Sequence, residues 1–187
     1  MPLPIGHALA GIAMRQARTA VFFANRWSDA LFFVFLANLP DADFLPGILL
    51  GKPNLYHHGI FHSLGAALAV AALGGWAFTW SRKSFRLAAA GIFLIFSTHL
   101  LLDFFAWDFH APLGLPLFWP FSSRYFIAAK PFFINITRSA AADDFLVSLF
   151  NRHNLTAALR ELLSLGGVAL AAAWLRWRLD KKRAPAG

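Results

Sequence analysis

The sequence predicts an all-α fold, a polytopic transmembrane bundle of about four to five membrane-embedded helices with an interfacial region of loops and short helices. Of the 187 residues, 58% are hydrophobic and only 14% are charged, and the mean hydropathy is +0.56. Soluble domains average about a quarter charged residues. The sequence also contains several apolar runs of about 20 residues each. This is the length of helix that crosses a hydrocarbon core of about 30 Å. The length of the chain indicates a single domain over residues 1–187.

Three later segments carry most of the transmembrane prediction. They are apolar, of spanning length and marked by tryptophan, which anchors helices at the membrane interface. We predict spans at residues 60–80, 87–107 and 157–177.

Two earlier segments are weaker candidates. Residues 28–45 are strongly apolar until Pro40 and two aspartates interrupt them, and Pro disfavours helix in the residue before it. Residues 6–25 carry Arg15 and Arg18, so this segment either lies at the interface or is buried by its neighbours. Residues 108–154 are rich in Pro and aromatics, and we expect an interfacial loop region there.

The net charge of +8 admits nucleic acid as a partner, but the placement of the basic residues disfavours it. They flank apolar runs, as the positive-inside rule expects of cytoplasmic segments. The two groups are Arg82, Lys83 and Arg86, and Arg176, Arg178, Lys181, Lys182 and Arg183. We therefore expect the lipid bilayer as partner, no nucleic acid, and a cytoplasmic C-terminus; the oligomeric state stays open.

Most histidines and several aspartates lie near the ends of the predicted membrane segments. If successive segments alternate in direction, a set of seven falls on one side of the membrane, and the basic groups fall on the other. An ionisable side chain inside a membrane costs about 2.5–3.5 kcal/mol for Asp on insertion scales and is usually functional. The set is His7, Asp41, Asp43, His58, His62, His99 and Asp103.

The chemistry of this set indicates a divalent metal site. Residues four apart share a face of a helix, so His58 with His62, and His99 with Asp103, would each aim two donor atoms at one point. The chain has no cysteine, which leaves N and O ligands. Three or four imidazoles and three carboxylates exceed the needs of one tetrahedral ion, and favour two ions sharing a carboxylate. Zn, Mn and Fe suit these ligands alike.

Other interpretations stay open for single residues. An isolated HxxxH or HxxxD arises by chance, and Asp in a PDxD turn often caps a helix. We expect His57 to point to solvent or lipid headgroups. Asp108 and His110 are either partners of the ligands or parts of a solvated loop. Arg124 and Lys130 either bind a phosphate or carboxylate or anchor headgroups.

Four motifs in order resemble the YdjM-like membrane-bound metal-dependent hydrolases. They are GHALAG at 6–11, NLPDADFLPG at 38–47, HHGIFHSLG at 57–65 and STHLLLDFF at 97–105, with WPFS at 119–122 similar to a weaker downstream motif. The resemblance implies all seven residues above as metal ligands. Two positions depart from it: the family has an Arg-Gly pair where Gly59 follows His58, and a Thr where Phe61 stands. Neither departure removes a ligand.

Together the residues and the resemblance predict a membrane-bound metal-dependent hydrolase in a bacterial-type inner membrane, with its site toward the outer face. Bound metal would lower the pKa of a water to about 7 and polarise a lipid-linked ester or phosphoester. Asp43 or Asp103 would remain outside the ligand set and move the proton. The alternatives are a metal-binding or transport protein without hydrolysis, and a structural protein in which these side chains fix helix packing.

Overall fold

The computed structural model describes residues 1–18, 20–109 and 113–183, and its regular elements there are helices. The longer ones are α1 (Pro4–Gln16), α2 (Arg26–Asn38), α4 (Leu64–Thr79), α5 (Phe85–Phe104) and α7 (Arg152–Arg183). The shorter ones are η1 (Leu39–Asp43), α3 (Phe44–Leu49), η2 (Ile60–His62) and α6 (Ala142–Ser148). In this described part, β-structure is limited to two isolated bridges. The all-α prediction is confirmed.

Three stretches are long and apolar enough to cross a membrane: Arg26–Leu49, Phe85–Phe104 and Arg152–Lys182. The first joins α2, η1 and α3, so Pro40 tightens the helix into a 3₁₀ turn. The apolar helix α4 is shorter, at 16 residues. The predicted span at 60–80 was too long at its start, because Ser63 caps α4 by accepting the Ala66 N–H.

Helix α1 ends at Gln16 and lies among α2, α5 and α7. Of the two possibilities for residues 6–25, burial by neighbouring helices is the one observed for this helix. Its arginines are paired: Arg15 Nε donates to Asp29 at 2.9 Å, and Arg18 donates to Asp180 at 2.7 Å. These pairs neutralise the cations at the end of α1 that is distant from His7.

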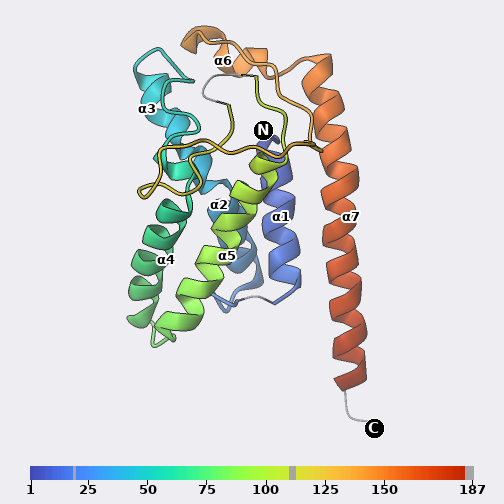
Figure 1. The fold of residues 1–187 in the computed structure, drawn as a ribbon. Coiled ribbons are helices and arrows are strands. Elements are labelled where there is room, and N and C mark those ends of the chain that lie inside the picture. The colour runs from blue at the N-terminus through green and yellow to red at the C-terminus, as the bar shows by residue number, and fades with distance from the viewer. Residues whose placement is uncertain (19, 110–112, 184–187) are drawn as a thin grey trace.

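The helices run side by side, and the chain reverses between successive long helices (Figure 1). The N-terminus, η1 and α3, the start of α4 and the end of α5 lie at one end of the bundle, and the segment from α5 to α7 passes over that end. The α4–α5 turn, the start of α2 and the end of α7 lie at the other end. The basic groups therefore sit opposite the end that carries His7 and Asp103.

The core between these helices is apolar and tightly packed. Phe33, Ile92, Ile95 and Phe96 are fully or almost fully buried, each with 0–1% exposure. Gly11 allows α1 to approach α2 closely, since a Cβ there would lie 2.7 Å from the carbonyl oxygen of Phe33. This packing fixes the distance between α1 and α2, and so the position of His7 relative to η1.

Candidate metal centre

All seven predicted ligands lie together at one end of the bundle. His7 comes from α1, Asp41 and Asp43 from η1, His58 and His62 from the loop and η2, and His99 and Asp103 from the last turns of α5. The side chains of His7, His62, His99 and Asp103 have 0% exposure. Asp41 is the most exposed of the seven side chains, at 13%. The seven side chains are therefore almost completely buried.

Four donor atoms from three elements form one compact group. The Nε2 atoms of His62 and His99 are 3.2 Å apart. Asp103 Oδ2 lies 3.4 Å from His62 Nε2 and 3.1 Å from His99 Nε2, and Asp41 Oδ1 lies 3.7 Å and 3.5 Å from the same two nitrogens. Ligands about 2.0–2.1 Å from a zinc ion at the corners of a tetrahedron are about 3.3–3.4 Å apart. The spacing of the His62, His99 and Asp103 atoms therefore fits three ligands of one tetrahedral divalent ion, and Asp41 lies near two of these three atoms.

The two imidazoles of this group, those of His62 and His99, are oriented by the contacts of their Nδ1 atoms. His99 Nδ1 donates to the carbonyl oxygen of Ala37 at 2.8 Å, which leaves the Nε2 lone pair directed at the group. His62 Nδ1 lies 2.9 Å from Asp43 Oδ2, which is an ion-pair distance, although the two atoms do not form a hydrogen bond. Metal-binding imidazoles are held in this way, with the distal nitrogen on a carbonyl or carboxylate. Two bare nitrogens 3.2 Å apart repel each other unless a proton or a metal ion lies between them.

Several buried polar atoms of the site have no hydrogen-bond partner within the protein, which is the second indication that it fits a metal ion. A buried polar atom left unpaired costs about 1–3 kcal/mol, and more if it is charged. Divalent cations would satisfy several of these atoms at once. The atoms are both ring nitrogens of His7, both oxygens of Asp41 and of Asp103, Nε2 of His58, Nδ1 of His62 and Oδ2 of Asp43.

Asp103 also reaches a second pair of imidazoles. Its Oδ1 lies 3.5 Å from His7 Nε2, and its Oδ2 lies 3.9 Å from His58 Nε2. The His7 ring stacks on His99, with ring centroids 3.6 Å apart. Asp103 therefore lies near the imidazoles of four histidines: His58, His62 and His99 at Oδ2, and His7 at Oδ1.

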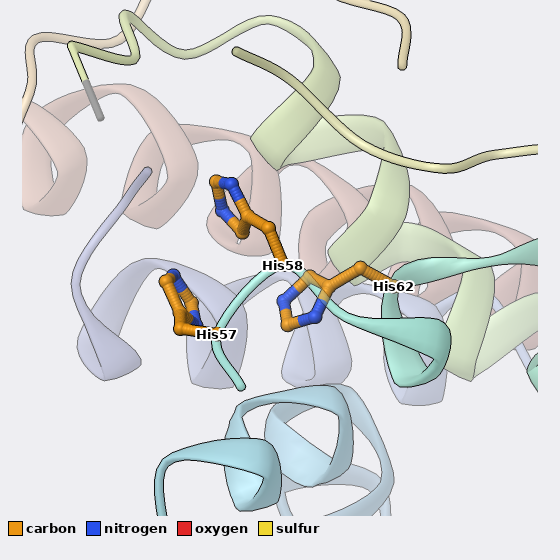
Figure 2. Close-up of side chains that lie close together, drawn as sticks. All are labelled: His57, His58 and His62. Carbon is orange, nitrogen blue, oxygen red and sulfur yellow. The ribbon is translucent and has the colours of Figure 1, made fainter. Parts of the chain in front are cut away.

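The expectation that His57 points to solvent or headgroups was wrong. Its side chain is 3% exposed, stacks on Phe44 with centroids 3.9 Å apart, and places Nδ1 3.1 Å from Asp43 Oδ1. Figure 2 shows the rings of His57, His58 and His62 close together. Burial lowers the pKa of His57 to about 3, the neighbouring His58 acts in the same direction, and Asp43 opposes them. His57 is therefore a neutral imidazole. The doubled HH at 57–58 was the only sequence signal for it.

Helical spacing explains one pair of ligands but not the other. His99 and Asp103 lie one turn apart on α5, with Nε2 and Oδ2 3.1 Å from each other. His58 precedes η2 with φ of +58°, an unusual conformation for a residue with a side chain, so it does not share a helix with His62. The loop nevertheless brings the rings within 5.0 Å, centroid to centroid.

The loop over the site supplies a further carboxylate. Asp108 Oδ2 lies 3.1 Å from His58 Nδ1 and accepts the Gly114 N–H, so Asp108 is a partner of a predicted ligand. His110 lies outside the described residues. Arg124 and Lys130 are exposed. Arg138, which the sequence did not single out, is half-buried over the ring of Phe44.

The N-terminal segment is attached to α7 by a buried carboxylate. Glu161 is 2% exposed, and its two oxygens accept the Leu3 N–H at 3.0 Å and 3.1 Å. A Cβ at Gly6 would lie 2.6 Å from Glu161 Oε2, so the helix can pass this closely only because residue 6 is glycine. These contacts fix the first turn of α1 and thereby the ring of His7.

The comparison with known proteins agrees with this site. One family model matches residues 1–182, and its description is YdjM inner membrane protein. No curated protein and no solved structure matches the chain. The matched range contains every donor described above as well as the loop over the site and α7. The resemblance observed over the first 105 residues therefore extends almost to the C-terminus.

Proposed function

The chain belongs to the YdjM inner membrane protein family, and from this premise we propose that it is a membrane-bound metal-dependent hydrolase acting on a lipid-linked ester or phosphoester. The convergence of buried, unpaired His and Asp donors at one end of the bundle carries the proposal. We take residues 1–187 as one domain, with 108–154 as the interfacial region.

Two metal positions account for the donors. The first would be held by His62, His99 and Asp103, with Asp41 close to both imidazoles. The second would draw on the two other imidazoles that lie near Asp103, those of His7 and His58. Zinc suits the first position by its geometry and its N and O ligands, and Mn or Fe are the alternatives. When bound, the ions supply an activated water and polarise the scissile group.

Asp43 is assigned a different role from the other carboxylates. Each of its oxygens lies against a ring nitrogen, Oδ1 at 3.1 Å from His57 Nδ1 and Oδ2 at 2.9 Å from His62 Nδ1. We therefore treat Asp43 as a positioning residue that holds His62 and as the carboxylate outside the ligand set. Its contact with the neutral imidazole of His57 holds the carboxylate in this position.

An apolar groove beside the centre supports a lipid substrate over a soluble one. It has a volume of about 610 Å³ and lies between α1 and the α2–η1–α3 stretch. Ile5, Phe35 and Leu45 line it and are 43–61% exposed. Asp41 belongs to its wall, while both Asp41 oxygens are buried on the side of the imidazoles. An alkyl chain in this groove would lie against Asp41, one of the proposed metal ligands.

The site is proposed to face the outer side of the inner membrane. The basic α4–α5 turn and the basic end of α7 lie at the opposite end of the bundle (Figure 1). The positive-inside rule assigns that end to the cytoplasm. Multiple crossings by α2–α3, α5 and α7 are part of the same proposal.

The test is metal content and turnover of the purified protein in nanodiscs. We expect bound metal by elemental analysis and hydrolysis of at least one substrate in a screen of lipid phosphoesters and esters. His62→Ala and Asp103→Asn should lose both, whereas His153→Ala and Asp143→Asn, which change exposed residues, should keep both. Turnover that persists in His62→Ala and Asp103→Asn would contradict the proposal.

A further inference from the structure

Arg138 lies in the loop between Phe133 and α6, and its guanidinium is held on two sides. Its Nε donates to Asn54 Oδ1 at 2.8 Å. The guanidinium carbon lies over the Phe44 ring, 5.3 Å from the centroid. Phe44 in turn stacks on His57, which contacts Asp43. This series of contacts ties the arginine to the wall of the metal centre.

Several carboxylates of the centre act on the charge of Arg138, but no ion pair joins them to it among the described residues. Burial lowers the pKa of Arg138, and the negative charges of Asp108, Asp41, Asp103 and Asp43 act in the opposite direction. Nevertheless its nitrogens have no carboxylate oxygen within 4.0 Å in the part of the chain that the structure describes. Asn54 and Phe44 hold the group back, so its two terminal NH₂ groups remain available to a ligand.

The charge of the centre indicates what kind of ligand this is. Asp41, Asp43, Asp103 and Asp108 form contacts with imidazoles in the described residues, and two divalent ions would balance the four carboxylates. Arg138 then remains as an excess positive charge beside the centre. A neutral carboxylic ester carries no negative charge before it reacts, whereas a phosphomonoester or phosphodiester carries at least one negative charge on its non-bridging oxygens. A guanidinium group binds two oxygens of one phosphate at once, through two parallel hydrogen bonds.

We propose that Arg138 is the specificity-determining residue that binds the phosphate group of the substrate, which makes the substrate class a phosphoester. The inference rests on the metal-centre assignment in the proposed function. It selects between the two substrate classes that the proposed function leaves open. Arg124 and Lys130, which the sequence pointed to, are exposed and lack contacts of this kind with the centre.

The first experiment measures binding without turnover. Inorganic phosphate is titrated calorimetrically into metal-loaded protein in phosphatidylcholine nanodiscs, with acetate as the carboxylate comparison. We expect Arg138→Gln to weaken phosphate binding about tenfold or more, since a charge-assisted hydrogen bond contributes roughly that much, with acetate binding and metal content unchanged. Arg124→Gln and Lys130→Gln are the matched controls and should bind phosphate as the wild type does.

A second arm identifies the source of the phosphate. Nanodiscs containing 10% phosphatidic acid present the same group on a lipid, and competition with soluble phosphate at Arg138 indicates a lipid-borne ligand. If soluble phosphate binds through Arg138 and phosphatidic acid does not compete, the ligand is a soluble phosphate compound. Both outcomes require Arg138 and support the phosphate assignment.

Two results would overturn the inference. One is phosphate affinity in Arg138→Gln equal to that of the wild type. The other applies if Arg138→Gln fails to retain metal: Arg138→Lys keeps the charge but not the paired donors, and equal phosphate affinity in that variant at full metal content excludes a role for the guanidinium. Phosphate binding through Arg138 without hydrolysis of any ester would contradict the hydrolase proposal alone.

Discussion

The Nε2 atoms of His62 and His99 lie 3.2 Å apart in a fully buried part of the site. Their ring partners on the far side, Asp43 and the Ala37 carbonyl, direct both lone pairs inward. Two carboxylates complete the group. Either a proton or a metal ion must lie between the two nitrogens, and the carboxylates beside them favour a divalent ion, so we expect the protein to bind one here and to depend on it for stability.

His99→Ala should abolish metal binding at the first position, because it removes a donor from the tetrahedral group. We expect at least a hundredfold weaker binding in a competition assay with a chromogenic chelator. The control is His153→Ala, which changes an exposed histidine whose Nε2 contacts the Asn135 carbonyl, away from the metal centre. Undiminished metal content in His99→Ala would contradict the assignment.

Asp43→Asn should weaken metal binding without abolishing it. The carboxylate holds His62 from behind, and losing such a partner typically costs about 10–100-fold in metal affinity or activity. Chelator competition measures the change, with Asp144→Asn on the exposed start of α6 as control. A complete loss of both ions would instead place Asp43 among the ligands.

Metal removal should destabilise the protein, and a mutation should reverse part of that effect. A ligand at about a hundred times its Kd adds about 2.7 kcal/mol to the free energy of unfolding. Chelation also leaves the buried oxygens of Asp41 and Asp103 without a hydrogen-bond partner, with only imidazoles beside them. Thermal unfolding with and without a chelator should show a lower midpoint for the metal-free protein. Metal-free Asp103→Asn should unfold at a higher temperature than the metal-free wild type, and added metal should no longer stabilise it.

Glu161→Leu should affect the second metal position and spare the first. The carboxylate fixes the Leu3 N–H and with it the first turn of α1 that carries His7. We expect elemental analysis to fall from two ions per chain toward one. Glu161→Gln, which retains an acceptor, should keep more of the second ion, and Arg160→Gln, on the exposed neighbour, should keep all of it. Equal loss of both ions would mean that Glu161 supports the whole fold.

A reporter fused after Gly187 should be active in the cytoplasm and inactive outside it. The basic residues at the end of α7 determine this orientation through the positive-inside rule. The same fusion with Arg176, Arg178, Lys181 and Lys182 changed to Gln tests the cause, and should give a mixed orientation. Activity of the unaltered fusion only outside the cytoplasm would place the site on the inner side.

The sequence by itself determined the helical class, the apolar segments and the identity of the chemical groups. Hydropathy and spacing are local properties, so they predicted α5 and α7 and the His99–Asp103 pair on one helix face. The alternation of segments also predicted that the donors meet at one end, because connected antiparallel helices bring every second terminus together.

Only the tertiary structure decided which donor faces which. His58 and His62 converge through a loop with positive φ and a 3₁₀ turn, and helical periodicity describes neither. The burial of His57, the contact of Asp108 with His58 and the position of Arg138 over Phe44 depend on a loop that crosses the end of the bundle. Such contacts join residues about 14 to 94 positions apart. No local pattern encodes them, because they form only when segments distant in the sequence pack against each other.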